Sequence, residues 1–248
     1  IEDMKHSFQY LFSVGQRTLK TFNSIAILLL MLTSATLISC SKEDPEPTDE
    51  DFTKEKTIFV YMPWTGTKQN LYDFFVYNIE DMKRGIVEQH GLKSTNLLVL
   101  IANSSTKSHL MRITYRNGKC YNDTLKVYNE GAMNTADKMA SLLNKVVEIA
   151  PAPTYSMIVG SHGVGWVYAS STSAHIRNRI AADRDKNEAL GLPITRQTRY
   201  FGGSDIQMDI DALANGIRRS RLQHLQFLLF DDCYMANIET AYELNRVT

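Results

Sequence analysis

The sequence predicts an α/β fold in which helices flank a sheet of mostly buried strands. Short, almost continuous apolar runs of strand length recur along the chain, and segments with apolar residues at helical spacing separate them. Such alternation is typical of a sheet that is covered on both faces. The chain has 248 residues, of which 44% are hydrophobic and 22% charged, so it can bury one sizeable core.

Four apolar runs have the length and composition of buried strands. They are residues 57–62, 96–102, 156–160 and 225–230. Between the second and third runs, Asn117-Gly118 predicts the turn of a hairpin that spans residues 110–127. Four other segments repeat apolar side chains at helical spacing. They are residues 70–88, 134–147, 208–219 and 234–245.

The first part of the chain has the pattern of a secretion signal. A basic flank at Lys20 precedes the short apolar run Ile25–Leu32, which is too short for a comfortable membrane span. The run ends in Leu37-Ile38-Ser39-Cys40, which resembles the lipobox of bacterial lipoproteins and implies lipidation of Cys40. We therefore expect a signal segment at 1–40, an acidic flexible tether at 41–55 and a folded domain at 56–248.

This reading implies a protein that a lipid anchor holds in the bacterial cell envelope. The acidic tract after Cys40 resembles the one that marks surface-exported lipoproteins in some Gram-negative bacteria, so we expect an outer-membrane location with surface exposure as an option. The 27 basic and 27 acidic residues balance, which argues against a nucleic-acid partner. The three cysteines show no metal-ligand spacing, and we expect Cys120 to be a structural residue.

The strongest functional signal is a histidine and a cysteine at the ends of two predicted strands. His162 follows the strand at 156–160 and Cys233 follows the strand at 225–230, at the edge where open α/β sheets place their ligands. An imidazole beside a thiol favours the nucleophilic thiolate and can protonate a leaving amine. The backbone N–H groups of Gly163 and of Cys233, the latter at a predicted helix start, are candidates for an oxyanion hole. Taken singly, each residue is also compatible with a purely structural role.

The residues around this pair resemble the clostripain-like family of cysteine peptidases, which is related by fold to caspases and gingipains. The resemblance rests on Ser161-His162-Gly163 with Gly165-Trp166, and on the block from Phe230 to Leu244 that contains Asp-x-Cys. It implies a caspase-like, mostly parallel sheet in an α/β/α sandwich. It also implies that His162 is the general acid/base and Cys233 the nucleophile of a cysteine endopeptidase.

The resemblance further implies that Asp231 binds the substrate and selects Arg or Lys before the scissile bond. A partly buried carboxylate suits this role because it pairs with a guanidinium or ammonium group. Asp232 remains a competing candidate, and either acid could instead cap the helix predicted at 234–245. The resemblance leaves calcium open as a cofactor, although the acidic stretch that family members often carry after the first strand is replaced here.

The polar segment 169–205 is a long connection with several basic residues. Since members of the family are often zymogens cut after a basic residue, candidate self-cleavage positions are Arg184, Lys186, Arg196 and Arg199. A solvated loop is the plain alternative.

Because Cys233 lies so near Thr248, we expect the peptidase domain to be incomplete on its C-terminal side. An inactive surface lipoprotein that binds peptides or proteins is the alternative function.

Overall fold

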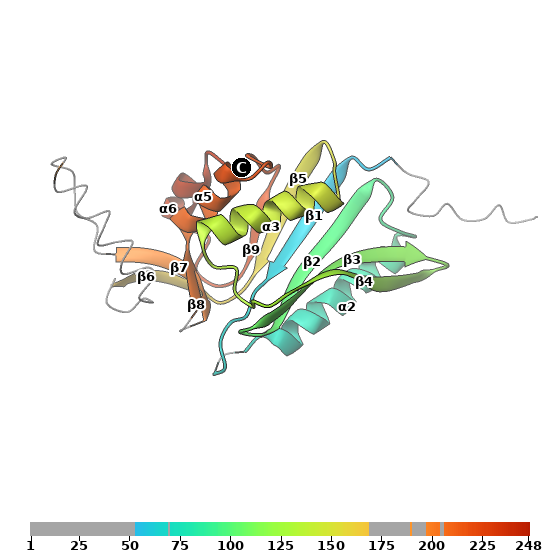
Figure 1. Cartoon of the computed structure of the whole chain (residues 1–248), viewed down its shortest axis with the longest axis horizontal. Helices are drawn as coiled ribbons and strands as arrows, with labels where there is room; N and C mark the ends of the chain where they lie inside the picture. The colour runs from blue at the N-terminus through green and yellow to red at the C-terminus, as the bar shows by residue number, and fades with distance from the viewer. Residues whose placement is uncertain (1–52, 69, 169–188, 190–196, 204–205) are drawn as a thin grey trace, which may run out of the picture. The chain divides into compact units, whose positions relative to one another are not determined.

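The computed structural model describes residues 53–68, 70–168, 189, 197–203 and 206–248, all of which belong to one compact unit, residues 47–248. A six-stranded sheet forms its centre, with helices on both faces (Figure 1). The predicted class, a mostly parallel α/β sheet flanked by helices, is confirmed. Cys40, Arg184, Lys186 and Arg196 lie outside the described residues.

The strands of the central sheet are ordered β4-β3-β2-β1-β5-β9. They are Lys56–Met62 (β1), Thr95–Ser104 (β2), Lys107–Arg116 (β3), Lys119–Tyr128 (β4), Thr154–Gly160 (β5) and Leu228–Asp231 (β9). Strand β1 pairs in parallel with β2 and β5, and β5 pairs in parallel with β9. Strands β3 and β4 form the predicted hairpin, in which Asn117 and Gly118 both have positive φ angles, as a tight primed turn requires.

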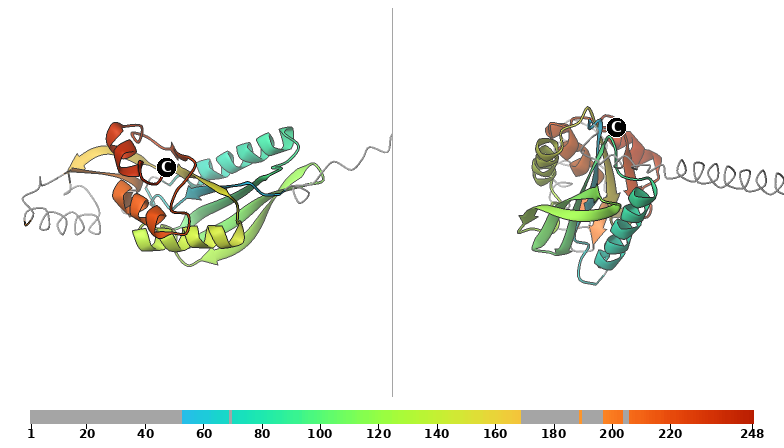
Figure 2. Two further views of the ribbon diagram at one scale, coloured as in Figure 1. Left: turned by 90° about the horizontal axis from the view of Figure 1, so that it is seen from above. Right: turned by 90° about the vertical axis from the view of Figure 1, so that its right-hand side faces the viewer.

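The helices cover the two faces of the sheet unequally (Figure 2). Tyr72–Glu88 (α2) packs on one face, while Ala136–Ile149 (α3), Ile210–Arg219 (α5) and Ile238–Leu244 (α6) pack on the other. Neighbouring strand residues point to opposite sides: Phe59 joins the core under α3 and α5, and Val60 joins the core under α2. The continuous apolar runs therefore reflect burial on both faces.

A second, three-stranded antiparallel sheet was not predicted. It consists of Gly163–Tyr168 (β6), Gln197–Gly203 (β7) and Ile206–Asp209 (β8), in the order β6-β7-β8. Strand β8 takes the first residues of the segment predicted as a helix at 208–219, and the helix begins at Ile210. Asp209 stays extended because its side chain caps the helix, accepting a hydrogen bond from the Ala212 N–H at 2.8 Å.

Candidate active site

The parallel ladder between β5 and β9 brings the histidine and cysteine segments together. Gly160 pairs with Asp231, and the Ser161 N–H donates a longer bond of 3.5 Å to the Asp231 carbonyl. His162 and Cys233 each lie two residues beyond this last rung, at the carboxyl end of the sheet. His162 is half-buried and Cys233 is exposed, so the thiol is accessible from solvent.

Gly163 makes the closest approach between the two segments. A Cβ atom at this position would lie 1.8 Å from the Cys233 carbonyl oxygen and 3.1 Å from Cγ of Asp232. Any other residue at position 163 would displace the cysteine backbone or itself. The glycine is therefore part of how the site is assembled.

The second sheet closes around the same edge. The Gly202 N–H of β7 donates to the His162 carbonyl at 2.8 Å, which ties the histidine backbone to the second sheet. Gly203 packs against the loop after β1, where a Cβ atom would lie only 1.7 Å from the Thr65 carbonyl oxygen. Segments that follow β1, β5 and β9 thus gather at one edge of the molecule.

Asp231 and Asp232 point to opposite sides of β9. The exposed Asp231 carboxylate lies toward α2, where Oδ2 accepts a hydrogen bond from Asn78 Nδ2 at 3.1 Å. It lines a pocket of about 280 Å³ between α2 and the sheet. Asp232 instead lines a groove of about 930 Å³ between β9 and α6. The two candidate specificity residues therefore serve two different cavities.

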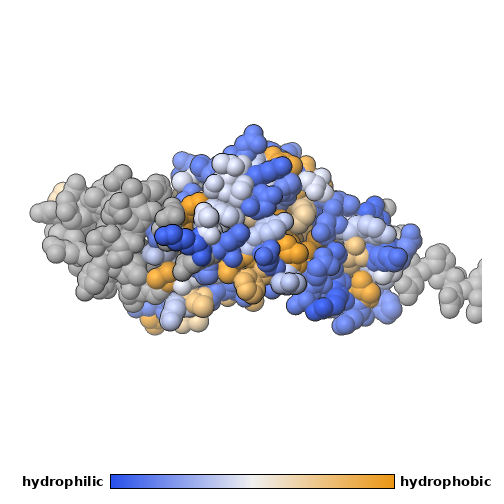
Figure 3. Space-filling view, turned by 90° about the horizontal axis from the view of Figure 1, so that it is seen from below, coloured by the Kyte–Doolittle hydropathy of each residue, from blue (hydrophilic) through white to orange (hydrophobic). Residues whose placement is uncertain are grey.

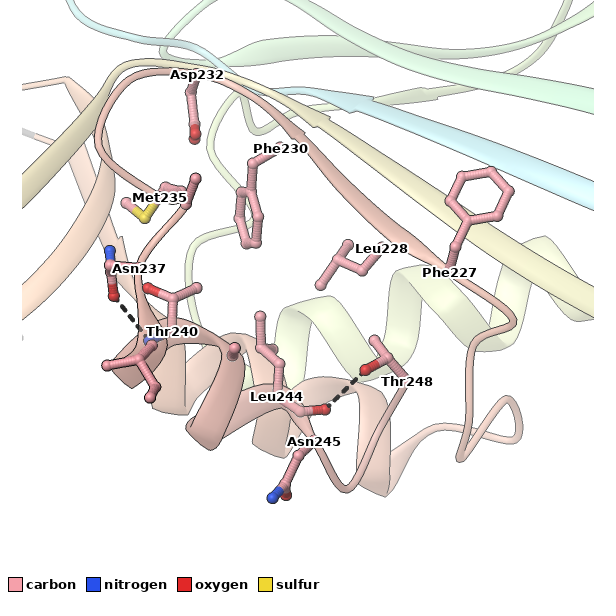
Figure 4. A pocket seen from close by; sticks show the side chains of 13 residues that line it. Phe227, Leu228, Phe230, Asp232, Met235, Asn237, Thr240, Leu244, Asn245 and Thr248 are labelled. Carbon is pink, nitrogen blue, oxygen red and sulfur yellow. Dashed lines mark hydrogen bonds between the residues drawn. The ribbon is translucent and has the colours of Figure 1, made fainter.

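The groove beside Asp232 is mainly apolar. Figure 4 shows the Asp232 carboxyl group directed into it, near Phe230 and Met235. Both carboxyl oxygens are buried, and neither has a hydrogen-bond partner among the described residues. Burial, with a smaller contribution from the negative charge of Asp231, raises the pKa of Asp232 to about 7.

The helix after the cysteine begins later than the sequence suggested. Helix α6 starts at Ile238, and Asn237 caps it by accepting a hydrogen bond from the Thr240 N–H at 2.9 Å. The prediction that Cys233 stands at a helix start is wrong, as is the alternative that Asp231 or Asp232 caps this helix. Tyr234 has a φ angle of 62°, a left-handed conformation that a right-handed helix cannot include. The oxyanion role of the Gly163 and Cys233 N–H groups stays a prediction, without support from a helix dipole.

Two other predicted residues can be placed. Arg199 lies in β7, the middle strand of the second sheet, so cleavage after it would require the strand to leave both neighbours. Cys120 is half-buried on β4, and its thiol donates to the Lys83 carbonyl at a sulfur–oxygen distance of 3.5 Å. This contact suits the structural role expected of Cys120.

The described part of the chain offers no group of three or more histidine, cysteine or acidic side chains that could hold a metal ion. A role for calcium therefore rests on the family resemblance alone. Among the described helices, none is long and apolar enough to cross a membrane.

Comparison with models of protein families shows which family the chain belongs to. The family model described as the clostripain family matches residues 60–248. The chain belongs to the clostripain family. No curated protein matches the sequence significantly.

Solved structures of clostripain-family proteins are similar to this chain. A secreted C11 cysteine protease of Bacteroides thetaiotaomicron, iotapain, is 37% identical with a TM-score of 0.62, and the match covers 79% of this chain and 51% of iotapain. A second secreted C11 protease of that species, bound to an irreversible peptide inhibitor, is 21% identical with a TM-score of 0.55, covering 78% of this chain and 47% of that one.

An inactive zymogen C11 protease from Parabacteroides distasonis is also 21% identical with a TM-score of 0.55, and the match covers 79% of this chain and 46% of that chain. The chain thus spans about half the length of these relatives. The two structures at 21% identity support the caspase-like fold of the clostripain family.

Sequence reasoning missed Asn78 altogether. It lies on the helix predicted at 70–88, but nothing in the local pattern distinguishes it from other polar residues of that helix. Its contact with Asp231 depends on how α2 packs against the sheet, so only the tertiary structure reveals it.

Proposed function

We propose that this chain carries the catalytic pair of a cysteine endopeptidase that cleaves after Arg or Lys. The observation that supports this most directly is the β5–β9 register, in which His162 and Cys233 follow the same rung of the ladder. Membership of the clostripain family and the likeness to iotapain support the same reaction class.

The proposed chemistry is acyl transfer. The Cys233 thiolate attacks the scissile carbonyl carbon, and the oxygen of the resulting tetrahedral intermediate takes the negative charge. His162 accepts the thiol proton and delivers it to the leaving amine, which departs with the C-terminal product. Water, deprotonated by His162, then hydrolyses the thioester and restores the free thiol.

The preference for a basic side chain rests on Asp231. Within the described residues no cation pairs with its carboxylate, and Asp231 lines a pocket whose walls are largely apolar. Such a pocket can hold the alkyl stem of Lys or Arg while the acid pairs with its charge. A neutral side chain would leave the carboxylate unpaired.

Reporter peptides that end in Lys, Arg or a neutral residue test this function in the full chain. We expect cleavage of the basic reporters only, and loss of cleavage in Cys233→Ala and in His162→Ala. The proposal fails if the purified protein cleaves no basic reporter and does not react with a thiol-directed peptide inhibitor that carries Lys or Arg.

The envelope location belongs to the same proposal. A lipid on Cys40 and an acidic tether would hold the peptidase at the bacterial outer membrane, and cleavage after Arg184, Lys186 or Arg196 would activate it. Cys40→Ala should release the protein from the membrane fraction. Mass spectrometry of the purified protein should locate any cut, and Cys233→Ala should remain uncut.

A further inference from the structure

The contact between Asn78 and Asp231 joins two elements that the chain itself keeps far apart. Asn78 lies in the second turn of α2, and Asp231 is the last residue of β9. The Asn78 amide donates a hydrogen bond to Oδ2 of Asp231 at 3.1 Å, and Oδ1 takes no part in this bond. An amide is a donor that does not neutralise the carboxylate, so it can orient the group while preserving its charge.

The pocket beside this contact has the dimensions and lining of a site for one long cationic side chain. Its volume is about 280 Å³. Met62, Met82 and Leu229 provide apolar walls, and Asn78, Asp81 and Asp231 provide the polar groups. An aliphatic stem can therefore lie against the methionines while its charged end reaches the acids.

The two acids of the pocket are not equivalent. Asp81 already forms an ion pair with Arg84 one turn further along α2. The Asp231 carboxylate has only the Asn78 amide as a partner among the described residues. The charge available to an incoming ligand is therefore that of Asp231.

Figure 3 shows that apolar patches interrupt an otherwise polar surface on one face of the unit, so exposed apolar area by itself does not identify the pocket.

We propose that Asn78 is a positioning residue that holds the Asp231 carboxylate for the basic side chain of the substrate and favours Lys over Arg. The amide takes one of the two acceptor positions of Oδ2, while Oδ1 keeps both of its own, so the carboxylate favours a donor that needs only one oxygen. A primary ammonium group needs one such contact, whereas guanidinium gains most from binding both oxygens as a fork. This role of Asn78 rests on the proposed function in one respect, because it takes the ligand of the pocket to be a side chain of the peptidase substrate.

A binding experiment tests this without relying on catalysis. Nα-acetyl-lysine amide and Nα-acetyl-arginine amide are titrated into the ¹⁵N-labelled full chain, and the signals of the Asn78 side-chain amide are followed. We expect both probes to shift these signals, with the lysine probe binding more tightly. Asp231→Asn should abolish both responses at the pocket.

Asn78→Leu removes the donor at nearly constant size, and the backbone signals around α2 then report binding. We expect the affinity for the lysine probe to fall about tenfold, the typical effect of losing a hydrogen bond to a charged group, and the Lys-over-Arg preference to disappear. If the leucine disturbs the helix, as a lowered melting temperature would reveal, Asn78→Ala removes the same donor.

The matched control is Asn144→Leu. Asn144 lies on α3, on the other face of the sheet, and also makes a tertiary hydrogen bond, because its Oδ1 accepts from the Arg221 N–H at 2.7 Å. If the Asn78 contact merely tied elements together, both substitutions would act through stability alone and neither would change the Lys-over-Arg ratio. That result, or no response of the wild-type pocket to either probe, would overturn the proposal.

Activity then separates the two proposals. If the protein binds the probes as expected but cleaves no basic reporter, the positioning role of Asn78 stands and the assignment as a peptidase fails. If the protein cleaves basic reporters but Asn78→Leu leaves the Lys-over-Arg ratio of kcat/KM unchanged, the assignment as a peptidase stands and the role of Asn78 fails.

Discussion

Gly160 of β5 and Asp231 of β9 are partners on the last rung of a parallel ladder. The histidine and the cysteine each follow this rung by two residues, so the register of the sheet sets the site. Because side chains alternate along a strand, a slip of one residue would turn Asp231 away from α2 and move Cys233 out of line with His162. The proposed chemistry therefore depends on how two strands pair.

If His162 and Cys233 act as one unit, their substitutions should not add. His162→Ala and Cys233→Ala should each lower kcat/KM for a basic reporter by about 10³-fold or more, and the double variant should be no worse than the poorer single one. Single-turnover assays of the four proteins check this. Independent, multiplying effects would contradict a shared catalytic role.

Gly163→Ala should damage the site more than the fold. The new methyl group would lie 1.8 Å from the Cys233 carbonyl oxygen, so the cysteine backbone must shift. A shift of about 1 Å in a catalytic group can lower kcat by about 10²-fold. Reporter kinetics and a thermal melt measure the two effects.

Gly85→Ala is the matched control for that change. Gly85 lies inside α2, and an added Cβ would meet no atom of the described residues within 4 Å. The substitution should raise the free energy of unfolding by about 0.5–1 kcal/mol through helix propensity and leave kcat/KM unchanged. Equal loss of activity in both variants would argue against the proposed contact between Gly163 and Cys233.

Asp232 should make the stability of the protein depend on pH. Because its pKa is raised from 3.8 to about 7, the folded protein holds this proton more tightly than the unfolded chain, and ionisation opposes folding. The contribution of Asp232 to the free energy of unfolding should fall as pH rises from about 4 to about 7 and stay level above that.

Asp232→Asn should remove this decline and make the variant more stable than the wild type at pH 8, by on the order of 1–2 kcal/mol after allowing for partial exposure. Urea titrations at pH 5 and pH 8 measure the difference. Asp73→Asn, which changes an exposed acid in the first turn of α2, is the control and should show no comparable gain. An Asp232→Asn variant that gains nothing between the two pH values would contradict the assignment.

Leu98→Ala should destabilise the core by about 2–5 kcal/mol, since Leu98 is fully buried in the central strand β2. Leu125→Ala on the edge strand β4 is the control, because Leu125 is 39% exposed and its truncation should change stability by about 0.5 kcal/mol or less. Chemical denaturation of both variants checks the contrast.

Several predictions from the sequence survive because they depend on local patterns. The apolar runs specify buried strands, and Asn117-Gly118 specifies the hairpin turn, since few other residues accept positive φ angles at both positions. Two helix starts were predicted wrongly: the helices begin at Ile210 and Ile238, not at residues 208 and 234. Pairing of β8 with β7 and the left-handed Tyr234 override the helical spacing of apolar residues there.

The sequence by itself determined the fold class, the strands that precede His162 and Cys233 and the family membership that their motifs indicate. These properties follow from short stretches whose hydrophobic period and residue types can be read one at a time. Only the tertiary structure decided that Asp231 meets Asn78 and that Gly163 packs against Cys233. It also buried the carboxyl oxygens of Asp232 without a partner among the described residues. Each of these contacts joins distant segments through the register of a sheet and the packing of a helix, which no local pattern encodes.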